Sequence, residues 1–200
     1  MADSAPWWAS ERSWRTAAVG VTGAMAVVLI FLTVDTYPAM QAGGSKVPPY
    51  TVINKAIDYR YNPKLKRQVP VVQDTDPLFG EKRSAAAAKA LVSKGKRIVQ
   101  GRNCMNCHTL LGNGAYYAPD LTKSWLDPAW GSPQARESMM LAFLQDPVTY
   151  GRGYGSERRM PDLDISESEA RAIIAFLKWM AAIDTNGFPA NFPTIQQGGG

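Results

Sequence analysis

The longest apolar run in the chain lies near its N-terminus. Residues 16–34 read TAAVGVTGAMAVVLIFLTV and contain no charged side chain. A helix over this run is ~28 Å long at ~1.5 Å per residue, close to the hydrocarbon thickness of a bilayer. The run predicts a transmembrane anchor over residues 16–35, preceded by a short cytoplasmic segment at residues 1–15. A cleaved signal peptide is the alternative, but its apolar region usually spans only about 7–15 residues.

Three later segments have the apolar spacing of amphipathic helices. One follows Ser84, contains Gly95, and repeats apolar residues at Ala88, Leu91, Val92, Ile98 and Val99. Glycine inside a helix costs ~1 kcal/mol relative to alanine, so we expect a close helix–helix contact there. A second segment covers residues 136–145. The last begins at a capping box of Ser166 and Glu169, and its apolar face consists of Ala170, Ile173, Ile174, Leu177 and Ala181.

The remaining segments lack a sustained apolar period. Residues 36–84 contain six prolines and the turn signals GG, PP, YNP and DTDP. They predict a linker or surface arm, with short strands near residues 50–53 and 69–72. Residues 191–200 are expected to form a flexible tail. The whole pattern predicts an all-α fold, with one transmembrane helix before a helical domain at residues 85–190.

Charge is unevenly distributed in this chain of 200 residues with a net charge of +5. Residues 36–103 carry 13 Lys and Arg against 4 Asp and Glu, whereas residues 104–200 carry 7 against 10. A basic segment beside an anchor is more typical of contact with anionic lipid or an acidic protein face than of nucleic-acid binding. We therefore expect membrane lipid, and no nucleic acid, among the partners.

Both cysteines and the single histidine of the chain fall in one motif, Cys104-Met105-Asn106-Cys107-His108. The order C-x-x-C-H attaches c-type haem: the two thiols reach the haem vinyl groups and the next residue supplies an imidazole to the iron. A thioredoxin-type redox motif would need a βαβ pattern, and a zinc site would lack a nearby fourth ligand. Haem attachment of this kind occurs outside the cytoplasm, so we expect the large C-terminal part in the periplasm.

The sixth iron ligand cannot be another histidine, so methionine is expected unless the position stays open for a gas. Met160 stands in a non-helical stretch before the last helix, where a loop can cross the haem. The other methionines of the domain, Met105, Met139, Met140 and Met180, are explained more simply by packing.

Further residues around the haem can be proposed from the sequence. The carbonyl of Pro119 could orient the imidazole, although an ordinary turn proline is an equal alternative. Arg158 and Arg159 could neutralise haem propionates, but two solvated arginines are the commoner pattern.

Three stretches of the sequence resemble the small cytochrome c subunit of bacterial nitric oxide reductase. They are GKRIVQGRNCMNCHTLLGNGAYYAPDL, RRMPDLDISE and FLKWMAAIDTNGFP. The resemblance implies a class I cytochrome c domain on one transmembrane helix in the inner membrane. It implies haem c bound at Cys104 and Cys107, with His108 and Met160 as axial iron ligands.

The resemblance also implies partners and a role. A soluble periplasmic cytochrome c or cupredoxin would supply electrons, and a large polytopic haem b subunit would receive them and reduce NO to N2O. This chain would be a non-catalytic electron-entry subunit. Gly114 and Tyr116 look like residues that help hold calcium between the subunits.

The sequence departs from the family pattern in two places, and two other functions stay open. Asn113 stands where an acidic residue is expected, and the arm at residues 36–84 is longer than the usual link. A stand-alone anchored carrier to another terminal oxidase is the main alternative, and a gas-sensing cytochrome with an open iron position is another.

Overall fold

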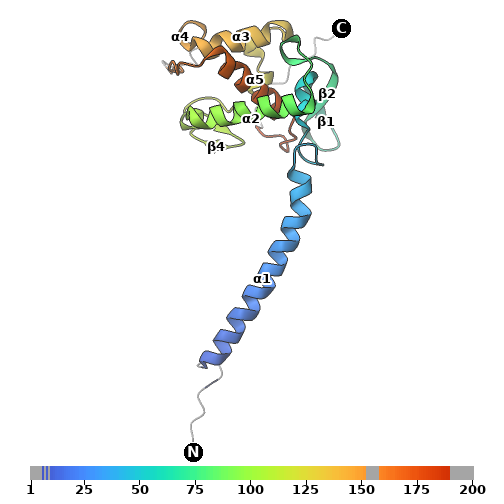
Figure 1. Cartoon of the computed structure of the whole chain (residues 1–200), viewed down its shortest axis with the longest axis vertical. Helices are drawn as coiled ribbons and strands as arrows, with labels where there is room; N and C mark the ends of the chain where they lie inside the picture. The colour runs from blue at the N-terminus through green and yellow to red at the C-terminus, as the bar shows by residue number, and fades with distance from the viewer. Residues whose placement is uncertain (1–5, 7, 9, 152–157, 190–200) are drawn as a thin grey trace, which may run out of the picture.

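The computed structural model describes residues 6, 8, 10–151 and 158–189. One long helix, α1 (Glu11–Met40), extends alone from one end of a helical domain (Figure 1). It is 30 residues long, contains the expected anchor, and buries none of its side chains. It is long and apolar enough to cross a membrane, with a mean hydropathy of 2.4 over its most apolar window. Because it packs against nothing in the domain, its apolar surface requires lipid or a partner protein.

The domain is built around α5 (Glu167–Ala181), whose capping box of Ser166 and Glu169 forms as predicted. The predicted apolar face of α5 is buried, and most of the rest of the helix is buried as well. The other helices are α2 (Ala85–Gly101), α3 (Pro133–Gln145) and the short α4 (Pro147–Tyr150). Helix α3 begins three residues earlier than expected because Ser132 caps it and Pro133 occupies its first turn.

Helices α2 and α5 cross in close contact at Gly95. A Cβ atom on Gly95 would lie 1.9 Å from the carbonyl oxygen of Ala172, so no larger residue fits without moving a helix. The predicted contact at this glycine is confirmed. The crossing places the C-terminal end of α2, which leads into Cys104, beside α5.

The segment expected to be a linker is folded onto the domain. It contains the 3₁₀ helices η2 (Tyr50–Asn54) and η3 (Leu78–Gly80), and an antiparallel hairpin of β1 (Lys55–Asn62) and β2 (Arg67–Thr75). Residues 50–53 are therefore 3₁₀ rather than strand, while residues 69–72 lie in β2. The prediction failed because apolar contributions here are short and scattered. The side chains that enter the core are Val52, Ile53, Ile57, Tyr59 and Leu78.

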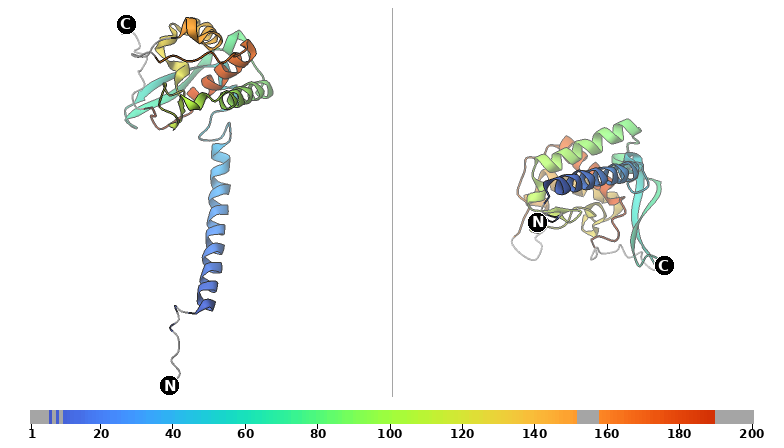
Figure 2. Two further views of the ribbon diagram at one scale, coloured as in Figure 1. Left: turned by 90° about the vertical axis from the view of Figure 1, so that its left-hand side faces the viewer. Right: turned by 90° about the horizontal axis from the view of Figure 1, so that it is seen from below.

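The fold is mostly helical, as predicted, with two small sheets that an all-α description omits. The second sheet pairs β3 (Thr109–Leu110) with β4 (Asn113–Gly114), just after the C-x-x-C-H motif. Figure 2 shows the first hairpin running out from the side of the domain. The expected flexible tail, residues 191–200, lies outside the described residues.

Candidate functional site

The C-x-x-C-H motif begins where α2 ends. Asn103 has a left-handed backbone with φ of 54°, which turns the chain out of the helix. Cys104–Asn106 then form the 3₁₀ turn η4, and the amide of His108 donates to the carbonyl of Cys104 at 3.0 Å. The two thiols are half-buried and are not joined to each other. Burial is the main cause that raises the pKa of the Cys104 thiol, so this group stays protonated at neutral pH.

The imidazole of His108 is oriented by a backbone carbonyl. Its Nδ1 lies 2.7 Å from the oxygen of Pro119, which confirms the predicted contact. A carbonyl only accepts hydrogen bonds, so the proton belongs on Nδ1. The lone pair of Nε2 is then available to a metal.

A ladder of contacts fixes Pro119 relative to the motif. Thr109 donates from Oγ1 to Asp120 at 2.6 Å, and the Leu111 amide donates to Oγ1 of Thr122 at 2.7 Å. These contacts and the one between His108 and Pro119 all join residues eleven positions apart. Sequence reasoning missed Thr109, Asp120 and Thr122. The equal spacing of polar residues across the two segments is the signal that could have found them.

A cavity of about 690 Å³ opens beside the motif, within the range of about 300–1,000 Å³ usual for ligand and cofactor pockets. The two cysteines and His108 line it, and so does Met160. The apolar part of its wall includes Leu121, Trp130, Phe143, Leu144, Ile173 and Leu177. Two thiols, an available imidazole and a thioether around an apolar cavity of this size fit a c-type haem.

Three methionines line this cavity. Met160 reaches it from the coil before α5, and Met139 and Met140 reach it from α3. Met140 is almost completely buried and belongs to the core, whereas Met160 is half-buried and packs against the core from its edge. The structure thus brings Met160 and His108 to one cavity, as predicted, and places two competing methionines in the same wall.

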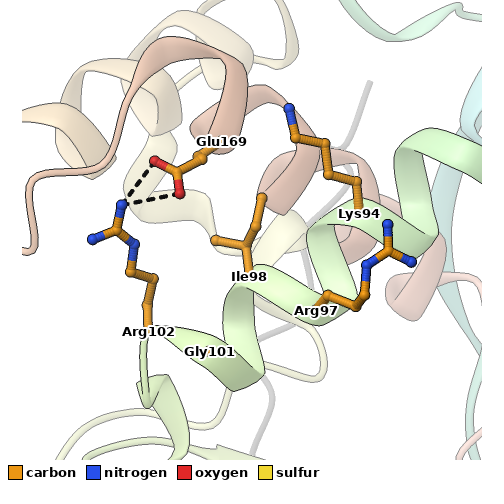
Figure 3. A pocket seen from close by; sticks show the side chains of 6 residues that line it. All are labelled: Lys94, Arg97, Ile98, Gly101, Arg102 and Glu169. Carbon is orange, nitrogen blue, oxygen red and sulfur yellow. Dashed lines mark hydrogen bonds and ion pairs between the residues drawn. The ribbon is translucent and has the colours of Figure 1, made fainter.

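Arg102 ties the Met160 segment to the end of α2. Its guanidinium donates to the carbonyls of Leu163 and Asp164 at 3.1 and 3.2 Å, and to both carboxylate oxygens of Glu169 at 3.0 Å. Figure 3 shows this pair at the edge of a small surface pocket between α2 and α5. Hydrogen bonds from Ser166 and Arg102 lower the pKa of Glu169. Sequence reasoning missed Arg102, although its position two residues before Cys104 could have drawn attention to it.

Arg158 and Arg159 also line the cavity, on the side of the Met160 segment. The guanidinium of Arg158 donates to the carbonyl of Tyr117 at 3.2 Å and lies 4.9 Å from the centre of the Tyr117 ring. This segment therefore brings two cations to the cavity, where they could meet anionic groups of a ligand.

The residues proposed for calcium lie at the small second sheet. Gly114 has a φ of 123°, and a Cβ there would lie 2.2 Å from the carbonyl oxygen of His108, so glycine is required. Tyr116 is 78% exposed and its hydroxyl donates to the carbonyl of Gly112 at 3.1 Å. Within the described residues, no group of three His, Cys, Asp or Glu side chains could hold a metal ion.

Comparison with known proteins identifies the family. A cytochrome c family model matches residues 92–181. The cytochrome c subunit of nitric oxide reductase from Stutzerimonas stutzeri is 32% identical over 118 residues, which cover 58% of this chain and 77% of that protein. This chain belongs to the family of nitric oxide reductase cytochrome c subunits.

Other members give the same result over shorter spans. The corresponding protein of Paracoccus denitrificans is 35% identical over 103 residues, covering 50% of this chain and 65% of that protein. The one from Halomonas halodenitrificans is 35% identical over 103 residues, covering 49% of this chain and 64% of that protein. This family member is thus a membrane-anchored cytochrome c, and its domain type implies a covalently bound haem c.

Proposed function

We propose that this chain is the electron-entry subunit of a cytochrome-c-type nitric oxide reductase. The observation that carries the proposal is the single cavity on which Cys104, Cys107, His108 and Met160 converge. The Fe(III)/Fe(II) couple of a haem bound there takes up and releases one electron at a time.

The chain's own residues bind and tune the haem in this proposal. Cys104 and Cys107 hold it through thioether bonds, and His108 and Met160 ligate the iron from opposite faces. The hydrogen bond to Pro119 keeps Nε2 of His108 directed at the metal. Arg158 and Arg159 neutralise the propionates, and the apolar wall excludes water, which favours the reduced iron.

The direction of electron flow follows from the topology we propose. The haem domain lies in the periplasm, where a soluble cytochrome c or cupredoxin reduces it. The electron then passes to haem b of a large polytopic subunit, which reduces NO to N2O. Chemistry on NO belongs to that partner, so this chain is not itself catalytic.

Purification of the native complex tests this proposal. An affinity tag on this chain should recover a polytopic haem b protein from native membranes in a fixed ratio, and the purified complex should reduce NO when a reduced donor is supplied. Recovery of this chain alone, with its haem still reducible, would favour the stand-alone carrier. An open iron position would instead be indicated if the oxidised spectrum lacked the methionine–iron band.

We also propose that the carbonyl of Gly114 and the phenol oxygen of Tyr116 contribute to a calcium site that the large partner protein completes. Hard cations prefer such oxygen ligands. Tyr116→Phe should then reduce the calcium content of the complex and slow electron transfer between the subunits, while the haem c spectrum stays intact. Unchanged calcium content and turnover would contradict this site.

A further inference from the structure

The hairpin of β1 and β2 is held rigidly at its base. Ile57 and Tyr59 are buried, and the Tyr59 hydroxyl donates to the carbonyl of Ile183 at 3.1 Å. Arg67, at the start of β2, donates through both terminal nitrogens to Asp184 at 3.0 Å. The position of the turn is therefore set by the end of α5, and the hairpin moves with the domain.

The turn itself is basic and partly apolar. Residues 60–66 include Arg60, Lys64 and Lys66 and no acidic residue. Tyr61 and Leu65 are 59% and 51% exposed. A cationic turn with an exposed aromatic and an exposed leucine has the composition of a membrane-interface contact, because its cations suit phosphates and its apolar groups suit the acyl boundary.

The hairpin also lies where such a contact is possible. Figures 1 and 2 show it on the side of the domain from which α1 leaves, with its turn at the lower edge of the domain. Helix α1 continues six residues beyond the apolar run that ends at Val34, to Met40. This extension of ~9 Å places the domain at the level of the headgroups. Tethering by α1 keeps the turn at a high local concentration near them.

We propose that the turn of this hairpin, residues 60–66, docks on anionic phospholipid headgroups beside the anchor. The ammonium groups of Lys64 and Lys66 contact phosphates, and Tyr61 and Leu65 lie at the boundary with the acyl chains. Two attachments, α1 and the turn, then restrict how the haem domain tilts relative to the membrane.

Amide hydrogen exchange of the full-length, haem-loaded chain in lipid nanodiscs tests the proposal. Discs of phosphatidylcholine are compared with discs of an equal mixture of phosphatidylcholine and phosphatidylglycerol. We expect amides of residues 61–66 to exchange about fivefold more slowly in the anionic discs, and high salt to abolish the difference. Amides at Ile57 and Val71, nearer the base, should exchange equally in both.

Variants separate charge from folding. Lys66 has a φ of 51°, a conformation that asparagine tolerates, so Lys64→Gln with Lys66→Asn removes two charges and keeps the turn. This double variant should lose most of the lipid-dependent slowing, whereas Lys64→Arg should keep it. Equal exchange in the two lipids, or full slowing in the double variant, would overturn the proposal. So would slowing that needs the large subunit in the disc and ignores lipid charge, since the turn would then contact protein.

Discussion

The two sides of α5 solve different problems. One side, through Ile173 and Leu177, forms part of the wall of an open cavity. The other side is closed, and Lys178, with no exposed surface, lies there 5.0 Å from the centre of the Trp125 ring. The first side needs a cofactor to complete its packing, whereas the second is completed by the chain itself.

The closed side is unusual because cations fill it. Lys178 donates to the carbonyl of Asp76 at 2.8 Å, and Lys123, 1% exposed, donates to the carbonyl of Ile183 at 2.8 Å. Burying an ammonium group costs several kcal/mol unless hydrogen bonds and nearby charges offset the loss of water. Carbonyl oxygens, aromatic faces and the carboxylate of Asp76 provide that compensation here. The arm before α2 supplies part of it, and this links the arm to the stability of the domain.

The change with the largest expected effect disrupts both sides together. Gly95→Leu places a side chain where the carbonyl of Ala172 lies, so α2 and α5 must separate. We expect a loss of about 3 kcal/mol or more in the free energy of unfolding, and little or no haem-loaded protein. The measurements are the yield of covalently bound haem and denaturant unfolding.

Gly101→Ala is the matched control in the same helix. A Cβ at Gly101 meets nothing within 4 Å, so this change should leave haem attachment normal and stability unchanged or slightly raised. If Gly95→Leu behaved like Gly101→Ala, the close crossing would not be what holds the two sides together.

Met160→Ala should disrupt only the open side. We expect loss of the methionine–iron band in the oxidised spectrum and binding of external ligands such as CO, while covalent haem remains. Met160→His should lower the reduction potential, because axial ligand identity is a main determinant of it. The competing ligands are tested by Met139→Ala and Met140→Ala. Loss of the band in either of these variants, and not in Met160→Ala, would reassign the ligand.

The two sides also differ in what the sequence reveals. The residues proposed to bind haem include a run of five with a known spacing, and Met160 stands out because its loop segment precedes a capped helix. The capping box, the glycine at the crossing and the Pro119 contact are predictable because each depends on neighbours or on a known motif.

The closed side could not be predicted because its contacts join distant residues of ordinary appearance. Lys123 and Ile183 are 60 positions apart, and Lys178 and Asp76 are 102 apart. In a sequence, a lysine near the end of a helix predicts a solvated charge. The arm was misjudged for the same reason, since its core residues stand singly among prolines and cations.

Lys123 makes the closed side sensitive to pH. Burial lowers the pKa of Lys123 to about 7, and the nearby Asp184 opposes this shift. Between pH 7 and about 10 the unfolded chain therefore binds more protons than the folded one. The free energy of unfolding should rise with pH across this window, by at most about 1.4 kcal/mol per pH unit for this group.

Lys123→Met should flatten that rise, as measured by denaturant unfolding at several pH values between about 6 and 10. A residual slope is expected because burial also lowers the pKa of Lys178. The exposed Lys89→Met serves as the control and should keep the slope of the parent chain. Identical slopes in the parent and Lys123→Met would show that this lysine does not titrate differently on folding.

The smallest effect concerns the tie between the two elements of the open side. Arg102→Gln removes the ion pair with Glu169 and weakens the contacts with Leu163 and Asp164, so the Met160 segment is held less tightly. Covalent haem and the parent spectrum should persist, while external imidazole should displace the sixth ligand at concentrations about threefold to tenfold lower, as for a loss of about 1 kcal/mol. Arg171→Gln is the control, since it removes an exposed pair with Glu167 on the same helix, far from any contact with the Met160 segment in the hydrogen bonds described. Arg102→Lys tests geometry against charge: an ammonium group cannot make the forked contact with the carboxylate, so it should restore only part of the parent's resistance to imidazole. Equal imidazole affinity in Arg102→Gln and Arg171→Gln would mean that the Met160 segment is positioned by its own packing, and that the open side, like the closed one, depends on buried contacts rather than on this pair.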